Sequence, residues 1–144
     1  MYKAFVRSQV RSAYAAISAG DMGKVTSSFA DDARFQMVGD HPFGGEQVGR
    51  AAIERWFERT HEVFPDLRLE PLAILVNGPP WSIRVAVRFR VTATLADGGR
   101  YENHGMQFLR LRGPTVLEDR LYEDTQVLAD AIERQLSARG EPVA

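Results

Sequence analysis

The spacing of apolar residues changes at Pro65, and this change constrains the possible fold more than any other feature of the sequence. Before Pro65, apolar side chains recur with the period of an amphipathic helix. After Pro65 they alternate with polar side chains, most clearly between Trp81 and Ala93, which is the pattern of a half-buried strand. Helices followed by strands predict a small α+β domain.

Turn and cap residues set the expected limits of these elements. Gly20 can end a first helix, Asp21 and Asp124 are natural N-caps, and Pro65 ends a helix. In chain order we expect helices at 2–17 and 22–29, a strand at 33–37, a loop at 38–49, a helix at 53–64, strands at 67–76, 81–93, 100–111 and 115–123, and a helix at 125–136. Helices packed on one curved, mostly antiparallel sheet leave room for an apolar pocket at its open end.

The length and charge of the chain exclude several classes of function. Its 144 residues fit one domain, expected over 1–136, with a flexible tail over 137–144. A net charge of −1 gives no field that would recruit nucleic acid or a membrane surface, so neither is expected as a partner. The chain has no cysteine, and its basic N-terminus lacks an apolar segment, so a cytoplasmic protein without disulfides is expected.

A series of short motifs resembles one known family in both content and order. The motifs are the segments AGD at 19–21, FADDA at 29–33, GRAAI at 49–53, FPD at 64–66, NG at 77–78 and RLYED at 120–124. Together they resemble the nuclear transport factor 2-like superfamily, in its SnoaL-like polyketide cyclase and ketosteroid isomerase-like branch. The resemblance implies a cone-shaped, curved antiparallel sheet wrapped around three N-terminal helices, with a short C-terminal helix, and a homodimer. It leaves the function open, because this fold hosts both enzymes and non-catalytic modules.

The resemblance also implies that the catalytic carboxylates known from this superfamily are missing. The positions that match them hold Met37, Ala86 and Leu121, none of which can exchange a proton. Gln107, or Met106 if the following turn differs by one residue, matches the position of a neutral carboxylic acid, and Tyr14 lies one residue after the position of a catalytic tyrosine. The familiar acid–base set of the isomerases is therefore not expected here.

Two residues remain as candidates for catalysis. Asp119 shares a strand face with Leu121 and Glu123, so it is a candidate acid or base if that face looks into the cone, and a solvated strand end if it does not. His41 lies in the Gly- and Pro-rich loop beside Asp40, where it is either a ligand-contacting group or an ordinary loop residue. Three scattered histidines predict no metal site, and we expect no cofactor.

The expected ligand is a small, largely apolar molecule, contacted by Tyr14, Phe35, Met37, Trp56, Phe64, Gln107 and Leu121. One hypothesis is a cofactor-independent isomerase, cyclase or dehydratase. A second is a non-catalytic ligand-binding or dimerisation module, for which the cavity should hold no titratable group with a perturbed pKa. A third is a protein-binding module, which needs a large exposed apolar patch.

Overall fold

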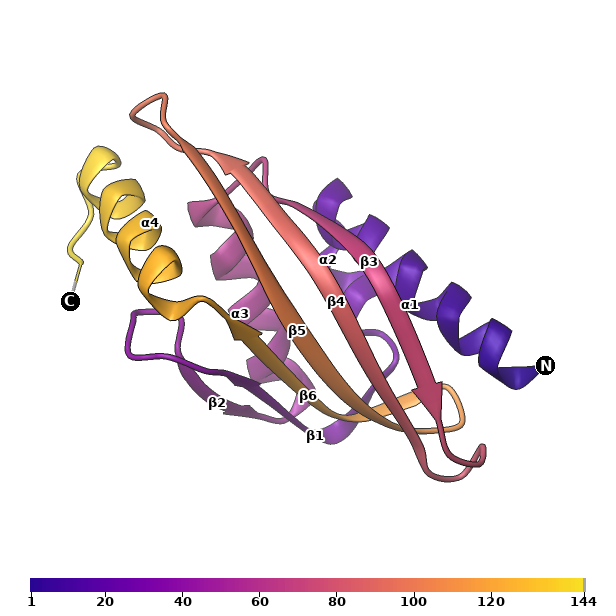
Figure 1. Ribbon diagram of the computed structural model, residues 1–144. Coiled ribbons are helices and arrows are strands. Elements are labelled where there is room, and N and C mark those ends of the chain that lie inside the picture. Colours follow the sequence, from indigo (N-terminus) through magenta and orange to yellow (C-terminus); the bar gives the residue numbers. More distant parts are fainter. Residues whose placement is uncertain (144) are drawn as a thin grey trace.

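The computed structural model describes residues 1–143 and forms one curved, open sheet with helices on its concave side (Figure 1). The elements are α1 (Tyr2–Ala19), α2 (Met22–Thr26), β1 (Phe29–Met37), β2 (Gly45–Val48), α3 (Arg50–Val63), β3 (Arg68–Asn77), β4 (Ile83–Thr94), β5 (Arg100–Arg112), β6 (Thr115–Glu123) and α4 (Thr125–Ala138). The α+β prediction is confirmed, and Asp21 and Asp124 are the N-caps of α2 and α4.

The six strands follow the order β2-β1-β6-β5-β4-β3. Neighbours are antiparallel except for β1 and β6, which run parallel in the middle of the sheet. Register shifts occur between β3 and β4 and between β5 and β6. Such bulges increase local twist, which helps the sheet to curve around the helices.

The concave face of the sheet holds the core. Alternate residues of β4 from Ile83 to Ala93 point inward and are almost fully buried. Helix α1 packs against β3, and α3 packs against β1. Gln135 fixes α4 to this body, because its side-chain amide donates to the carbonyl of Val63 and accepts from the backbone N–H of Ala96, at 2.6 and 2.7 Å. Helices α1, α3 and α4 therefore each cover a different part of the concave side.

The structure differs from the sequence prediction around the first strand. Helix α2 ends at Thr26 and β1 begins at Phe29, so the acidic pair Asp31 and Asp32 lies within a strand and not at a helix end. The predicted loop at 38–49 contains the short strand β2, which pairs antiparallel with β1. Exposed, mostly polar residues form β2, and a short edge strand of this kind carries no hydrophobic period.

The C-terminal segment also differs in its limits. Helix α4 continues to Ala138, two residues into the segment expected as a tail. Beyond it, Glu141 forms ion pairs with Arg59 and Arg139. A flexible tail stays a prediction for the end of the chain, and residue 144 lies outside the described residues. Among the described residues, no helix is both long enough and apolar enough to cross a bilayer.

Candidate functional site

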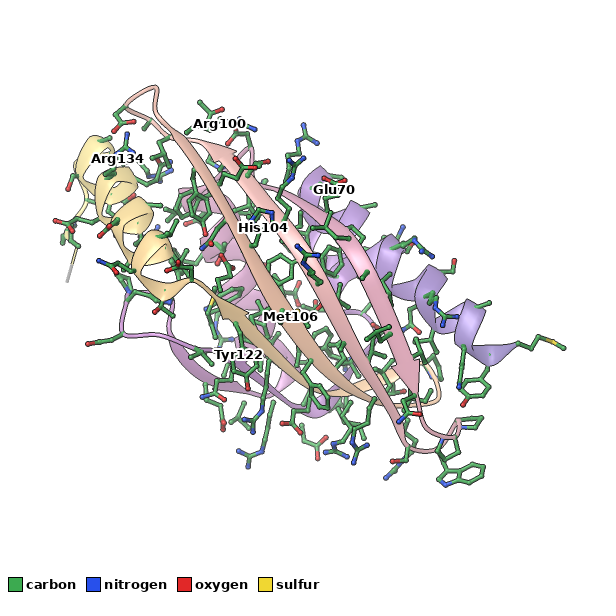
Figure 2. All side chains as sticks on the ribbon, in the orientation of Figure 1. Glu70, Arg100, His104, Met106, Tyr122 and Arg134 are labelled. Atoms are coloured by element: carbon green, nitrogen blue, oxygen red, sulfur yellow. The ribbon has the colours of Figure 1, made fainter. Side chains whose placement is uncertain are left out.

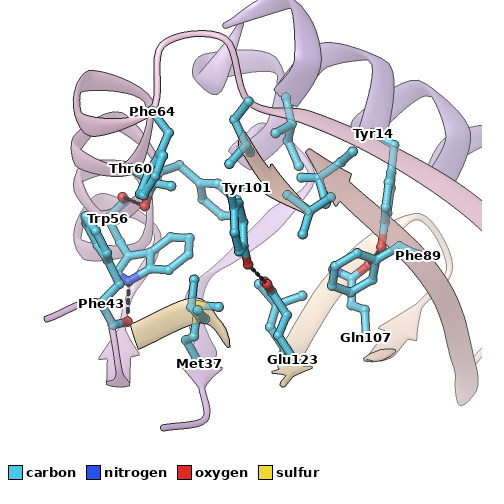
Figure 3. A pocket seen from close by; sticks show the side chains of 17 residues that line it. Tyr14, Met37, Phe43, Trp56, Thr60, Phe64, Phe89, Tyr101, Gln107 and Glu123 are labelled. Carbon is cyan, nitrogen blue, oxygen red and sulfur yellow. Dashed lines mark hydrogen bonds between the residues drawn. The ribbon is translucent and has the colours of Figure 1, made fainter. Parts of the chain in front are cut away.

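A cavity of about 80 Å³ lies between α1, α3, α4 and the concave face of the sheet (Figure 3). That volume is room for several water molecules or a small ring. Of the seven residues predicted to contact a ligand, six line this cavity: Tyr14, Met37, Trp56, Phe64, Gln107 and Leu121. Apolar and aromatic side chains make up most of the remaining wall.

Phe35 is the predicted ligand-contacting residue that does not line the cavity. Its side chain is fully buried, and its ring lies 4.4 Å from that of Trp56 and 5.3 Å from that of Phe57, between centroids. Both of those neighbours do line the cavity. Phe35 therefore supports the wall from behind, since it shares a strand face with Met37 but is covered by Trp56 and Phe57 of α3.

One polar group in the wall joins α1, β5 and β6. The Tyr14 hydroxyl donates to Oε1 of Gln107 at 2.8 Å, and Nε2 of Gln107 donates to Oδ1 of Asp119 at 2.9 Å. Burial raises the pKa of Asp119 to about 7, against the lowering effect of the Gln107 hydrogen bond. Burial, with the charges of Asp119 and Glu123, also raises the pKa of Tyr14. Asp119 is therefore an interior carboxyl group and not a solvated strand end.

A second polar group lies at the end of β6. The Tyr101 hydroxyl donates to Oε1 of Glu123 at 2.6 Å, and Nδ2 of Asn103 donates to the same oxygen at 3.4 Å and to the carbonyl of Asp124 at 3.0 Å. Burial raises the pKa of Glu123, while these two donors oppose the rise. Tyr101 and Glu123 both line the cavity, between Trp56 on one side and Gln107 on the other (Figure 3).

Tyr101 and Asn103 were not among the residues predicted to form the site. The signal was present, because the alternation of β5 places both residues on the same face as Gln107. Gly105 of the same strand allows Glu123 to approach. A Cβ atom at Gly105 would lie 2.6 Å from the ring of Phe89 and 2.9 Å from Cγ of Glu123.

A smaller cavity of about 50 Å³ lies behind the first polar group. Tyr14 and Gln107 line both cavities, whereas Asp119 lines only the smaller one. Gln9 also lines the smaller cavity, and its buried Oε1 has no hydrogen-bond partner among the described residues. The carboxyl group of Asp119 is therefore connected to the main cavity through Gln107.

His41 lies outside both cavities. Its Nδ1 accepts from the backbone N–H of Phe43 at 3.2 Å, and its Nε2 lies 3.3 Å from the carbonyl of Val38. Burial lowers the pKa of His41, against the raising effects of the Val38 hydrogen bond and Asp40, and so favours the neutral ring. The histidine holds the loop that carries Phe43 into the wall of the main cavity.

The ionisable side chains around the two cavities are all acidic. Among the described residues that line them, the ionisable side chains are Tyr14, Tyr101, Asp119 and Glu123, and none is a lysine, arginine or histidine. No group of three potential metal ligands occurs within residues 1–143. An anionic ligand would therefore meet no compensating positive charge in this interior.

The sequence over residues 10–118 matches the model of the SnoaL-like domain family, and the chain belongs to that family. The structure is similar to that of Bal32a from a soil-derived mobile gene cassette, at 25% identity and a TM-score of 0.75, covering 90% of this chain and 95% of that one. The nuclear transport factor 2-like cone expected from the sequence motifs is thereby confirmed.

Two further structures share the fold. TerC, co-crystallised with polyporic acid, is 19% identical with a TM-score of 0.75, covering 88% of this chain and 96% of that one. A putative polyketide cyclase from Xanthomonas campestris is 17% identical with a TM-score of 0.66, covering 91% of this chain and 98% of that one. No curated protein matches the sequence closely enough to transfer an activity.

Proposed function

We propose that this protein is an enzyme that moves a proton on a small, largely apolar carbonyl compound without a bound cofactor. The observation that carries the proposal is the placement of Glu123. Its carboxyl group lines an otherwise mainly apolar cavity, with the Tyr14–Gln107 pair on another part of the wall. A raised carboxyl pKa within the cavity favours catalysis over the non-catalytic hypothesis, which required no perturbed titratable group.

Glu123 is suited to act as the acid and base. Tyr101 and Asn103 both donate to Oε1, which orients the carboxyl group and leaves Oε2 without a hydrogen bond among the described residues. The pKa raised by burial makes the carboxylate a stronger base than an exposed glutamate. This assignment revises the expectation that Asp119 makes the direct contact, because Asp119 does not line the main cavity.

Gln107 and Tyr14 are suited to hold the carbonyl oxygen. In the sheet register Gln107 lies opposite Leu121 and Gly105 lies opposite Glu123, so Gln107 and Glu123 are diagonal neighbours. Side chains in that relation are about 7–8 Å apart at their origins, which leaves space for a small ring between them. A carbonyl oxygen at Gln107 and Tyr14 would place its neighbouring carbon toward Glu123.

The reaction then follows from these positions. The Glu123 carboxylate takes a proton from the carbon beside the carbonyl, the C–H electron pair forms a C=C bond, and the carbonyl π pair moves onto oxygen. A hydrogen bond from the Tyr14 hydroxyl, once it turns from Gln107 to the ligand, stabilises that charge. In a β,γ-unsaturated ketone, return of the proton to the γ carbon re-forms the carbonyl and moves the C=C bond, which is an isomerisation. In a β-hydroxy ketone, the carbonyl re-forms as hydroxide leaves the β carbon and takes the proton from Glu123 as water, which is a dehydration.

The names of two similar structures support a small organic molecule as the ligand. TerC was co-crystallised with polyporic acid, and the Xanthomonas protein is a putative polyketide cyclase.

The family resemblance also leads us to propose a homodimer. Exposed apolar side chains on neighbouring strands support a contact through the outer face of the sheet, where Met106 and Tyr122 point away from the helices (Figure 2).

Exchange of carbon-bound hydrogen tests the proposed chemistry. The protein is incubated in D₂O with cyclopentanone, a ketone with one small ring, and deuterium incorporation beside the carbonyl is followed by NMR. We expect catalysed exchange, reduced about 10²-fold or more in Glu123→Gln, because the amide cannot accept the proton. Glu118→Gln is the matched control, since Glu118 lies on the same strand but pairs with Arg110 and Arg120. Exchange at the uncatalysed rate with bound ketone would favour the non-catalytic binding module.

A further inference from the structure

We infer that Gln107 is a reversible connector, through which protonation of Asp119 turns the Tyr14 hydroxyl from Gln107 toward a hydrogen-bond acceptor in the main cavity. Asp119 is then a positioning residue that acts through Gln107. The inference rests on the proposed function for the identity of the acceptor, a ketone oxygen. Its own basis is the count of donors and acceptors in the chain Tyr14–Gln107–Asp119.

In the arrangement described above, the Tyr14 proton is already in use. Its hydroxyl donates to Oε1 of Gln107 at 2.8 Å, so the oxygen of Tyr14 can offer a ligand only its lone pairs. Nε2 of Gln107 donates in turn to Oδ1 of Asp119 at 2.9 Å, which suits an ionised carboxylate. With Asp119 ionised, the hydroxyl therefore favours a donor ligand over a ketone.

A bound ketone adds a hydrogen-bond acceptor and so changes how the donors and acceptors of this chain are paired. If Tyr14 turns its proton to the ketone oxygen, Oε1 of Gln107 loses its donor inside the protein, and an unpaired buried acceptor is costly. Rotation of the amide by half a turn, with a proton on Asp119, restores every bond. Asp119 then donates to Oε1, Nε2 donates to the oxygen of Tyr14, and Tyr14 donates to the ketone.

The surroundings of Asp119 make this exchange of a proton feasible. The polar residues that line the smaller cavity with it are Gln9 and Tyr14 from α1, Ser28, and Gln107 from β5, and none of the lining residues carries a cationic side chain. Its nearest carboxyl group on the same strand face, Glu123, lies four residues further along β6. The pKa of about 7 is consistent with both protonation states near neutral pH.

Binding of a ketone should therefore be accompanied by proton uptake. Isothermal titration calorimetry with cyclopentanone, in buffers of different ionisation enthalpy, measures that uptake directly. We expect it to approach one proton per ligand at about pH 8, where Asp119 is ionised before binding, and to vanish at about pH 5. Cyclopentane, which has the same ring without the oxygen, should bind with no uptake.

Variants separate the connector from other sources of protons. Asp119→Asn should bind cyclopentanone without uptake, and Gln107→Leu should do the same although Asp119 is retained. Glu123→Gln should keep the uptake while losing hydrogen exchange. Uptake without exchange in the wild type would overturn the proposed catalysis and leave the connector, whereas exchange without uptake would overturn the connector. Uptake that persists in Gln107→Leu, or failure of cyclopentanone to bind, would also overturn the inference.

Discussion

The carboxyl group of Asp119 sets the behaviour of the interior at the scale of single residues. Its burial is complete enough to raise the pKa to about 7 from a reference of 3.8, and no cation opposes the rise. The folded protein thus binds a proton at pH values where the unfolded chain has released it. Between those two pKa values, stability falls as pH rises, and it stays low above pH 7.

Asp119→Asn should therefore stabilise the protein at alkaline pH. The amide is neutral at all pH values and still offers an oxygen to Gln107, so the cost of burying the charge disappears. We expect the free energy of unfolding to rise by about 1–3 kcal/mol at about pH 8 and to change little at about pH 5. Urea denaturation at both pH values measures this. An equal loss of stability at both would show that the carboxyl group is needed for packing.

The sequence identified Asp119 as a candidate residue but could not show whether its side chain is buried. Alternation along β6 put its side chain on the face of Leu121, and the resemblance identified Gln107 and Tyr14. The burial of all three depends on how α1 lies across β5 and β6, a contact between distant parts of the chain. The choice between the two interpretations of His41 was open for a similar reason. Its ring nitrogens are occupied by the backbone of its own loop, which residue type and neighbouring charge do not reveal.

Strand β5 positions the site at the scale of elements. It carries Tyr101, Asn103 and Gln107 on one face, and Gly105 between them lies opposite both Phe89 and Glu123. The missing Cβ at Gly105 is what allows Phe89 and Glu123 to pack over the strand. Strand β5 therefore contributes side chains to the site and, at Gly105, the space that lets Glu123 and Phe89 come close to the strand.

Gly105→Ala should disturb both stability and the site. The added methyl group would meet the backbone carbonyl oxygen of Tyr122, the ring of Phe89 and Cγ of Glu123 within 3.0 Å. We therefore expect a loss of about 1–3 kcal/mol and a slower hydrogen exchange of cyclopentanone. Thermal denaturation and the exchange assay measure these effects. Gly23→Ala is the control, because a Cβ there meets no atom closer than 4.0 Å. A Gly105→Ala protein as stable and active as the wild type would contradict this account.

The predictability of the elements follows their burial pattern. Strand β4 alternates strictly between buried and exposed or half-buried residues, and its existence was readable from the sequence alone. Strand β2 is short and mostly exposed, and its formation depends on the edge that β1 offers. The early start of β1 at Phe29 likewise depends on pairing with Val116 of β6. Such long-range pairing leaves no local period.

At the scale of the whole molecule, the outer face of the sheet carries the apolar surface that we propose for dimerisation. Met106, Phe108 and Tyr122 are exposed there on the adjacent strands β5 and β6, and Met106 lies directly opposite Tyr122. Apolar side chains gathered on neighbouring strands are a suitable surface for a second copy of the chain. This agrees with the homodimer that the family resemblance leads us to propose.

Phe108→Glu should shift such a dimer to monomer. A charge at that position would have to be buried without a partner in the contact, so we expect at least a tenfold weaker association by sedimentation velocity. Val127→Glu on α4 is the control, since it replaces a similarly exposed apolar residue away from the sheet. A wild-type protein that sediments as a monomer at micromolar concentration would refute the proposal.

The parallel pairing of β1 with β6 has a consequence for biosynthesis. The strand that begins at Phe29 can complete its hydrogen bonds only after Val116 and the residues that follow it have been made. Until those residues have been synthesised, the apolar faces of the N-terminal helices and of the β1–β2 hairpin lack the strands that cover them in the folded protein. Folding that depends on contacts between the two ends of a chain is slow and exposed to aggregation. Production of this protein should therefore depend on chaperones more than its small size suggests.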